Sequence, residues 1–112
     1  MGMSIDIERR QSRLSIGTGG LSGACVKPVA LRMVHQVARA VNIPVVGLGG
    51  IMNATDAIEF LMAGATAIEI GTANFIDPTT TIRVIDGMNE WLDNHGVKDV
   101  HEIIGCLKWF WA

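Results

Sequence analysis

Long apolar runs, an excess of basic residues and clustered cysteines are all missing from this sequence of 112 residues. No run approaches the roughly 18 apolar residues of a membrane-spanning helix, and the charged start around Asp6, Glu8 and Arg9 has no signal-peptide pattern. A formal net charge of −2 leaves no basic surface for nucleic acid. We therefore expect a cytoplasmic protein that binds neither nucleic acid nor a membrane.

Cysteine and histidine are too scattered for the common metal sites. Cys25 and Cys106 lie far apart without a CxxC pattern, which predicts reduced thiols and neither a zinc site nor a disulfide framework. The three histidines do not cluster either. The chain also lacks the Gly-Lys-Ser/Thr of a P-loop and the GxSxG of a serine hydrolase. These absences argue against zinc enzymes, P-loop proteins and serine hydrolases.

Helical and strand patterns alternate along the rest of the chain. Hydrophobic residues make up 49% and charged residues 18%, which is the composition of a globular domain. The alternation, with short links, predicts a parallel α/β sheet. Helices are predicted over residues 27–41, 53–63 and 78–92, strands over residues 45–48 and 67–70, and a last short helix over residues 99–107.

Local signals support several of these boundaries. Pro28 suits the first turn of a helix. Asn53 is a natural N-cap, and Asp56 is expected to act as the return half of a capping box. Gly64 stands where a helix ends in a left-handed residue. The first helix has an apolar face at helical spacing, made of Val29, Met33, Val37 and Val41.

The N-terminal part differs from this pattern. Residues 1–16 alternate apolar and polar positions and predict a small hairpin laid over a larger unit. Residues 17–23 contain four glycines and predict a loop. We treat residues 1–112 as one partial domain, with the hairpin and glycine-rich loop in 1–26 and the β/α units and terminal helices in 27–112. Because two strands cannot close a sheet, we expect further chain before Met1.

Two glycine segments each follow a predicted strand. The first is 47–51 (GLGGI) and the second is 71–74 (GTAN), and Gly49 and Gly71 lie 22 positions apart. Glycines let backbone N–H groups approach an anion closely, and the last two loops of a (β/α)8 barrel commonly bind phosphate. The Thr72 hydroxyl would add a donor. Tight turns are the alternative explanation for such glycines, and two segments in consecutive β/α units make it the weaker one. Neither segment fits the dinucleotide-binding pattern.

Three further features have no clear role at this stage. Cys25 precedes a lysine and a helix start, where a thiol can ionise early, but a small filling residue is the more common role of such a cysteine. Glu69 lies inside a predicted strand without an assigned role. The tail Trp109-Phe110-Trp111 is either a docking element, an aggregation-prone end or a stretch not native to the fold.

Several segments together resemble the C-terminal portion of the class 1B dihydroorotate dehydrogenase catalytic subunit, from about Gly2 to Leu107. They occur in the family's order and spacing, and the first two favour class 1B over class 1A. The segments are 19–23 (GGLSG), 27–34 (KPVALRMV), 43–51 (IPVVGLGGI), 57–65 (AIEFLMAGA) and 71–75 (GTANF).

This resemblance implies a C-terminal fragment of a (β/α)8 TIM barrel: its last two β/α units, the preceding helix and a hairpin insertion. The complete enzyme would oxidise dihydroorotate to orotate in pyrimidine biosynthesis, as a homodimer core working with a subunit that carries FAD and an iron–sulfur cluster and reduces NAD. The residues matching the family's FMN contacts are Gly23, Gly49, Gly50, Gly71 and Thr72, the last four at the phosphate end.

Other family residues have no counterpart in this chain. The resemblance places the catalytic cysteine, a lysine beside the flavin and a substrate-binding Asn-Thr pair upstream of Met1, so the chain alone is expected to be inactive. Cys25 stands where the family has a small residue or proline and is not the base. Residues 12–16 and the aromatic tail also depart from the family's pattern. A non-catalytic phosphate- or nucleotide-binding half-barrel, or another phosphate-binding barrel enzyme, remains an alternative.

Overall fold

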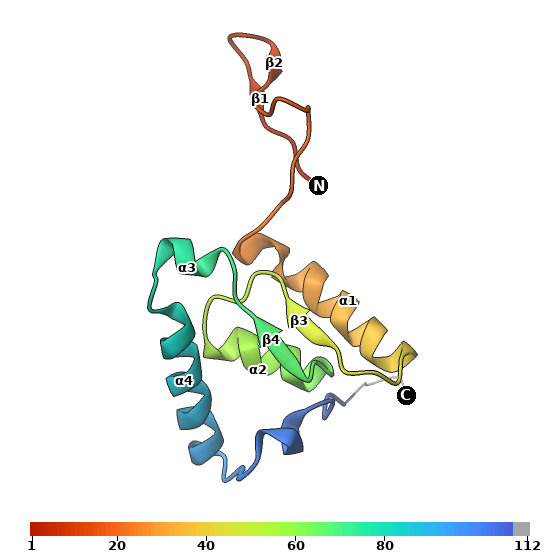
Figure 1. Cartoon of the computed structure of the whole chain (residues 1–112), viewed down its shortest axis with the longest axis vertical. Coiled ribbons are helices and arrows are strands. Elements are labelled where there is room, and N and C mark those ends of the chain that lie inside the picture. Colours follow the sequence, from red (N-terminus) through yellow and green to blue (C-terminus); the bar gives the residue numbers. More distant parts are fainter. Residues whose placement is uncertain (109–112) are drawn as a thin grey trace.

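The computed structural model of the chain describes residues 1–108. The predictions made for the aromatic tail at 109–111 lie outside these residues. Figure 1 shows a body of helices and strands with a hairpin extending from it. The main elements are α1 (Lys27–Ala40), β3 (Val46–Leu48), α2 (Ala54–Ala63), β4 (Ala67–Glu69), α3 (Ala73–Ile76) and α4 (Thr80–Asn94).

Strands β3 and β4 pair in parallel, with Gly47 opposite Ile68 and Leu48 opposite Glu69. Because successive side chains alternate between the faces of a strand, Gly47 and Ile68 turn toward the helices. Val46 and Leu48 lie on the other face, which is exposed. The chain is therefore an α/β structure with a partial parallel sheet, as the sequence predicts.

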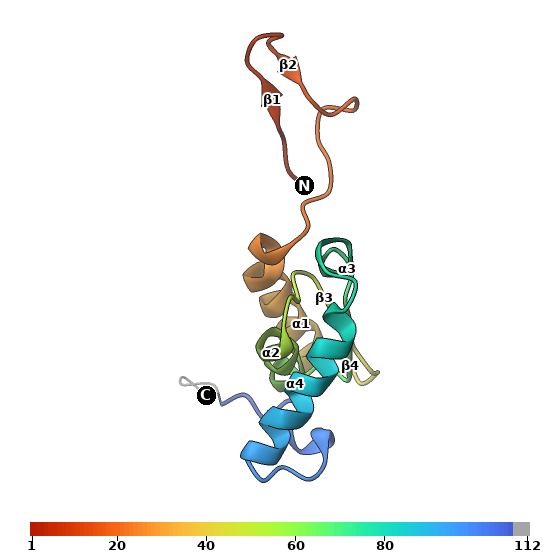
Figure 2. The same cartoon turned by 90° about the vertical axis from the view of Figure 1, so that its left-hand side faces the viewer.

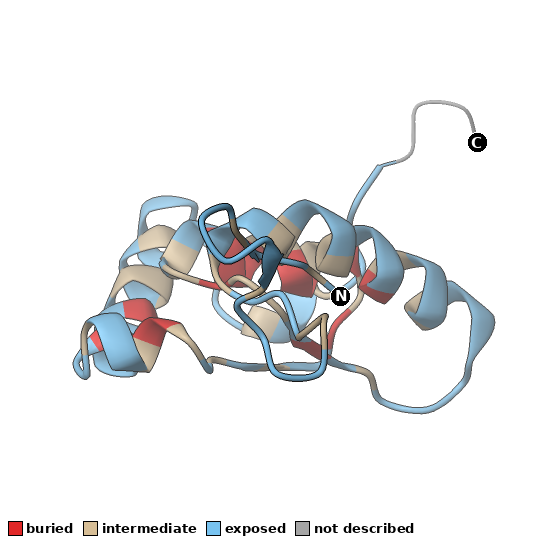
Figure 3. Cartoon of the chain, turned by 90° about the horizontal axis from the view of Figure 1, so that it is seen from above, coloured by how far each residue is buried: buried red, intermediate tan, exposed pale blue. Residues whose placement is uncertain are grey.

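The core lies between this sheet and the helices. One cluster gathers Val34, Ile51, Ala57, Phe60, Ala65 and Val84, and a second gathers Ile58, Leu61 and Ile103. Figure 3 shows the buried residues in red within the body and none in the hairpin. Phe60 is the largest fully buried side chain. It lies directly under β3, where a side chain at Gly47 would come within 2.7 Å of its Cδ1 atom.

Helix α1 uses a different face from the one that its sequence pattern suggests. It contacts the core through Val34, with Ala30 and Leu31 packed beside it. The predicted apolar face, including Val29, Met33 and Val37, is exposed. The spacing of apolar residues identified a stripe on the helix but could not say which face of the helix meets α2.

The N-terminal end of α1 and both ends of α2 agree with the sequence prediction except in one detail. The Asn53 side chain accepts a hydrogen bond from the Asp56 N–H at 3.0 Å, as predicted for an N-cap. The Asp56 carboxylate, however, accepts from the N–H of Met52 at 2.9 Å and not from that of Asn53. The predicted capping box is therefore wrong in its return half, because Asp56 is oriented by other partners. Helix α1 has its proline at the start, and Gly64 ends α2 in a left-handed conformation, both as predicted.

The C-terminal elements differ from the prediction: α4 is shifted toward the C-terminus and the last helix is shorter. Helix α3 was not predicted as a separate element, and α4 starts only after Thr79 because Asp77 accepts hydrogen bonds from the Thr79 N–H and hydroxyl. These bonds, followed by one from Arg83, lower the pKa of Asp77. The predicted last helix is a 3-10 turn, η2 (Val100–Ile103), that ends well before Leu107, although Asp99 and Glu102 form a complete capping box at its start.

The N-terminal hairpin forms but does not cover the body. Strands β1 (Ile5–Asp6) and β2 (Gln11–Ser12) pair in antiparallel fashion. Figures 1 and 2 both show the hairpin standing away from the helices. A 3-10 turn, η1 (Ala24–Val26), then leads into α1. Among the residues that the structure describes, no helix is long and apolar enough to cross a membrane.

Candidate functional site

An open cavity of about 360 Å³ lies where β3 and β4 end, next to the loop that enters η1. Parallel strands end at the same edge of a sheet, so the residues that follow them come together there. The cavity is lined by all five residues that the resemblance assigns to FMN: Gly23, Gly49, Gly50, Gly71 and Thr72. Residues that lie up to 49 positions apart in the sequence thus share one space.

Gly49 and Gly50 lie where the wall of this cavity packs closely against other segments of the chain. Both have positive φ angles, 120° and 76°, which other residues rarely adopt. A Cβ atom on Gly50 would lie 2.8 Å from the Gly23 carbonyl oxygen and 2.8 Å from the Lys27 nitrogen. One on Gly49 would lie 2.6 Å from the Ala30 Cβ. The β3 loop (residues 49–52) is therefore pressed backbone-to-backbone against η1 and the start of α1.

Gly71 and Thr72 form the opposite wall under different constraints. A Cβ atom on Gly71 would meet no protein atom within 4 Å. The packing of the described residues thus does not itself require glycine there. The Thr72 hydroxyl has no hydrogen-bond partner among residues 1–108, so it is available as a donor. Asn74 fixes this wall, because its side-chain amide donates to the Ile70 carbonyl at 2.8 Å.

The cavity lining carries little charge. Among the described residues that line it, Glu69 alone is charged, and it is exposed on the open face of β4. An anion here would be bound by backbone N–H groups and a hydroxyl, as in phosphate sites built from glycine-rich loops. Glu69 would repel that anion, which favours the glycine side of the cavity. The glycine backbone of the β3 loop, which we call the backbone cradle, and the Thr72 hydroxyl, unbonded within residues 1–108, fit a phosphate group.

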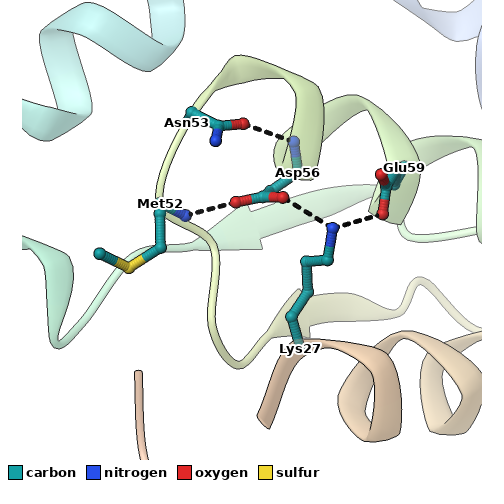
Figure 4. A network of polar contacts seen from close by, with 5 residues as sticks. All are labelled: Lys27, Met52, Asn53, Asp56 and Glu59. Atoms are coloured by element: carbon teal, nitrogen blue, oxygen red, sulfur yellow. Dashed lines mark hydrogen bonds and ion pairs between the residues drawn. The ribbon is translucent and has the colours of Figure 1, made fainter. Parts of the chain in front are cut away.

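A lysine cluster, made of Lys27, Asp56 and Glu59, supports the β3 loop from behind. The Lys27 Nζ donates to Asp56 Oδ1 at 2.7 Å and to Glu59 Oε2 at 2.8 Å. Figure 4 shows Asp56 between this ammonium group and the N–H of Met52. Sequence analysis missed the cluster. The three-residue spacing of Asp56 and Glu59 places both carboxylates on one helix face. No pattern in the sequence, however, indicates that they pair with a lysine in another helix.

Lys27 is charged at neutral pH. Hydrogen bonds to Asp56 and then to Glu59 raise the pKa of Lys27 above its usual 10.5. A lysine whose pKa rises on folding stabilises the folded state fully below its unfolded pKa, and loses that contribution as the pH rises through the folded value. The contribution of the lysine is therefore present throughout the neutral range and is lost as the pH rises into the alkaline range.

Cys25 does not pair with Lys27. Its exposed thiol donates to the Ser22 carbonyl oxygen at 3.6 Å, while the lysine ammonium is held by the two carboxylates. Cys25 is also absent from the residues that line the cavity. Within the part of the chain that the structure describes, no group of three or more His, Cys, Asp or Glu residues could hold a metal ion.

Comparison with known proteins gives a consistent result. The sequence model of one family, described as dihydroorotate dehydrogenase, matches residues 1–92. The catalytic subunit of dihydroorotate dehydrogenase B (NAD(+)) from Bacteroides fragilis is 68% identical over 108 residues, which are 96% of this chain and 36% of that protein. The subunit of the same name from Trichlorobacter lovleyi is 56% identical over 107 residues. The chain thus spans about a third of the length of these relatives.

Solved structures agree with the sequence matches. The crystal structure of DHODH in complex with ferulenol from Eimeria tenella aligns with a TM-score of 0.75 and 29% identity, over 94% of this chain and 29% of that one. The ligand-free structure from the same organism aligns with a TM-score of 0.74. On the family match and the identity over nearly its whole length, this chain belongs to the dihydroorotate dehydrogenase family.

Proposed function

We propose that this chain forms the FMN-phosphate end of a dihydroorotate dehydrogenase barrel. The observation that carries the proposal is the convergence of Gly23, Gly49, Gly50, Gly71 and Thr72 on one cavity with a backbone cradle. In this proposal Gly49 and Gly50 offer backbone N–H groups to the phosphate, and Thr72 adds its hydroxyl. Gly71 leaves the space that the ligand fills.

The complete protein would oxidise dihydroorotate to orotate in pyrimidine biosynthesis, in the cytoplasm. FMN, when bound, supplies the hydride acceptor for such an oxidation. The residues of this chain bind and orient the cofactor. The order α1, β3, α2, β4 and α4 supports the assignment to the last two β/α units of the barrel with the preceding helix.

A partner subunit is part of this proposal. The matched relatives are named catalytic subunits of an NAD(+)-linked enzyme, which implies a second subunit in those proteins. By analogy, we propose that the complete protein is a homodimer core that passes electrons to a subunit carrying FAD and an iron–sulfur cluster, and from there to NAD.

Replacing Gly71 by leucine tests the cofactor assignment. The new side chain meets no protein atom at its Cβ but occupies the proposed ligand space. We expect Gly71→Leu to weaken FMN binding by at least about 100-fold, equivalent to about 2.7 kcal/mol, with the melting temperature nearly unchanged. Flavin fluorescence titration of the purified chain measures the binding, and thermal unfolding measures the stability.

Gly20→Leu is the matched control. Gly20 also has open space at its Cβ position but does not line the cavity, so this variant should bind FMN like the unmodified chain. If Gly71→Leu binds FMN equally well, the assignment of this cavity is wrong. Binding of inorganic phosphate without any flavin binding would favour the alternative of a phosphate-binding module.

We further propose that the chain of 112 residues does not oxidise dihydroorotate by itself. The catalytic cysteine that the resemblance implies has no counterpart here, and neither Cys25 nor Cys106 lines the cavity. Spectrophotometric assay with dihydroorotate, FMN and an artificial electron acceptor should therefore detect no orotate. Measurable orotate formation that depends on this chain would contradict the proposal.

A further inference from the structure

Lys27 contacts the β3 loop from two directions. Its backbone nitrogen and Cβ lie 2.8 and 2.9 Å from where a Cβ of Gly50 would stand, so no side chain fits between them. Its ammonium group binds Asp56, whose second carboxylate oxygen accepts from the Met52 N–H at 2.9 Å. The contacts run from Gly50 through Lys27 and Asp56 back to Met52. Together with the chain from Gly50 to Met52 they close a ring, and Figure 4 shows the half that runs from Lys27 through Asp56 to Met52.

The contact between Lys27 and Asp56 is the more buried part of this ring, so other groups cannot easily compensate for its loss. Asp56 is buried, with its side chain 12% exposed, and that of Lys27 is 24% exposed. Hydrogen bonds between charged groups are stronger than neutral ones, and a buried carboxylate that loses its cation is left uncompensated. Glu59 is the outer partner, because its side chain is 39% exposed.

The ammonium group of Lys27 does not reach the ligand space. Lys27 is not among the residues lining the cavity, and its Nζ is held by two carboxylates. The lysine can therefore affect a bound phosphate only through the position of the β3 loop. That loop supplies Gly49 and Gly50 to the cavity wall.

We propose that Lys27 is a positioning residue for the phosphate site: it fixes the β3 loop against Gly23 from one side and, through Asp56 and Met52, from the other. This inference rests on the proposed function, because it assumes that the phosphate of FMN binds at this loop. Loss of the ammonium group frees the Met52 end of the loop and misplaces the backbone donors. The effect falls on the phosphate and spares the rest of the flavin.

Comparison of FMN with riboflavin separates positioning from general stability. Riboflavin lacks the phosphate, so it reports the remaining contacts alone. We expect Lys27→Met to raise the Kd for FMN about tenfold while the Kd for riboflavin changes less than about threefold. Lys27→Arg keeps a cation and should recover part of the loss. Glu59→Gln keeps the Asp56 bond and should weaken FMN binding less than Lys27→Met does.

Arg32→Met is the control on the same helix. Arg32 is exposed and, among residues 1–108, its side chain bonds only to Gln36 in the same helix, so the ratio of the two Kd values should not change. If Lys27→Met weakens both ligands equally, Lys27 is merely structural and the inference is overturned. An unchanged FMN Kd overturns it too. If the unmodified chain shows no preference for FMN over riboflavin, the proposed function itself fails, and with it this inference.

Amide hydrogen exchange gives a second measurement that needs no ligand. In the unmodified chain the Met52 N–H is bonded to Asp56. We expect it to exchange faster in Lys27→Met, while amides in the middle of α4 remain unaffected. Unchanged protection of Met52 would show that Asp56 holds the loop without Lys27, and would overturn the inference even if the variant binds FMN poorly.

Discussion

Gly50→Ala is expected to reduce FMN affinity by about 100-fold or more, equivalent to about 2.7 kcal/mol. The added methyl group would stand 2.8 Å from the Gly23 carbonyl oxygen and from the Lys27 nitrogen. Both are backbone atoms on the far side of the loop and have no flexible end that can move aside. The β3 loop must therefore shift, and the phosphate donors shift with it.

Backbone strain contributes separately to this variant. At a φ of 76°, alanine costs about 1–2 kcal/mol relative to glycine even in open space. Gly96→Ala isolates that cost, because Gly96 has a φ of 65° and no atom within 4 Å of its Cβ position. We expect Gly96→Ala to lower the free energy of unfolding slightly without changing FMN binding.

The two variants are compared by flavin fluorescence titration and by urea unfolding. If the close contacts of the added methyl group cause the effect, FMN affinity is lost in Gly50→Ala and not in Gly96→Ala. If Gly50→Ala binds FMN like the unmodified chain, the close contact between the β3 loop and η1 does not support the phosphate site. If Gly96→Ala loses affinity to the same degree, the effect reflects stability and not loop position.

Sequence reasoning was most successful where local chemistry decides the structure. Glycine segments after apolar strands, Pro28 at a helix start and Asn53 as an N-cap each act within a few residues. The structure confirms the order α1, β3, α2, β4 and α4 that they imply, with the short α3 added. The convergence of Gly49 and Gly71 on one cavity could also be expected, because parallel neighbouring strands end at one edge.

The remaining features depend on contacts between distant segments. Asp56 was expected to bond back to Asn53, but Lys27, 29 positions upstream, orients its carboxylate elsewhere. The part of α1 that packs on α2 is likewise fixed by tertiary contacts, so Val34 is buried while Met33 is exposed. The spacing of residues within one helix predicts neither the partner of Asp56 nor the face of α1 that packs on α2. The exposed face of α1 fits the proposed barrel, where neighbouring helices pack side by side.

Phe60→Ala is expected to cost about 3–5 kcal/mol of the free energy of unfolding. Phe60 has no exposed surface and stands at the centre of the larger core cluster, between α2 and β3. Because Gly47 packs directly on its ring, the cavity left by truncation lies beneath the strand that carries the first glycine segment. A typical domain has only about 5–15 kcal/mol in total, so a loss of this size is a large fraction of the stability of a domain.

Phe75→Ala provides the matched comparison. It removes the same atoms from a side chain that is 93% exposed, and surface substitutions of this kind change stability by no more than about 0.5 kcal/mol. Urea unfolding followed by circular dichroism measures both variants. Similar destabilisation by the two would show that Phe60 is not the centre of the core. Since Gly47 leads into the β3 loop, we also expect Phe60→Ala to weaken FMN binding under conditions where it remains folded, whereas loss of stability with unchanged affinity would separate the core from the site.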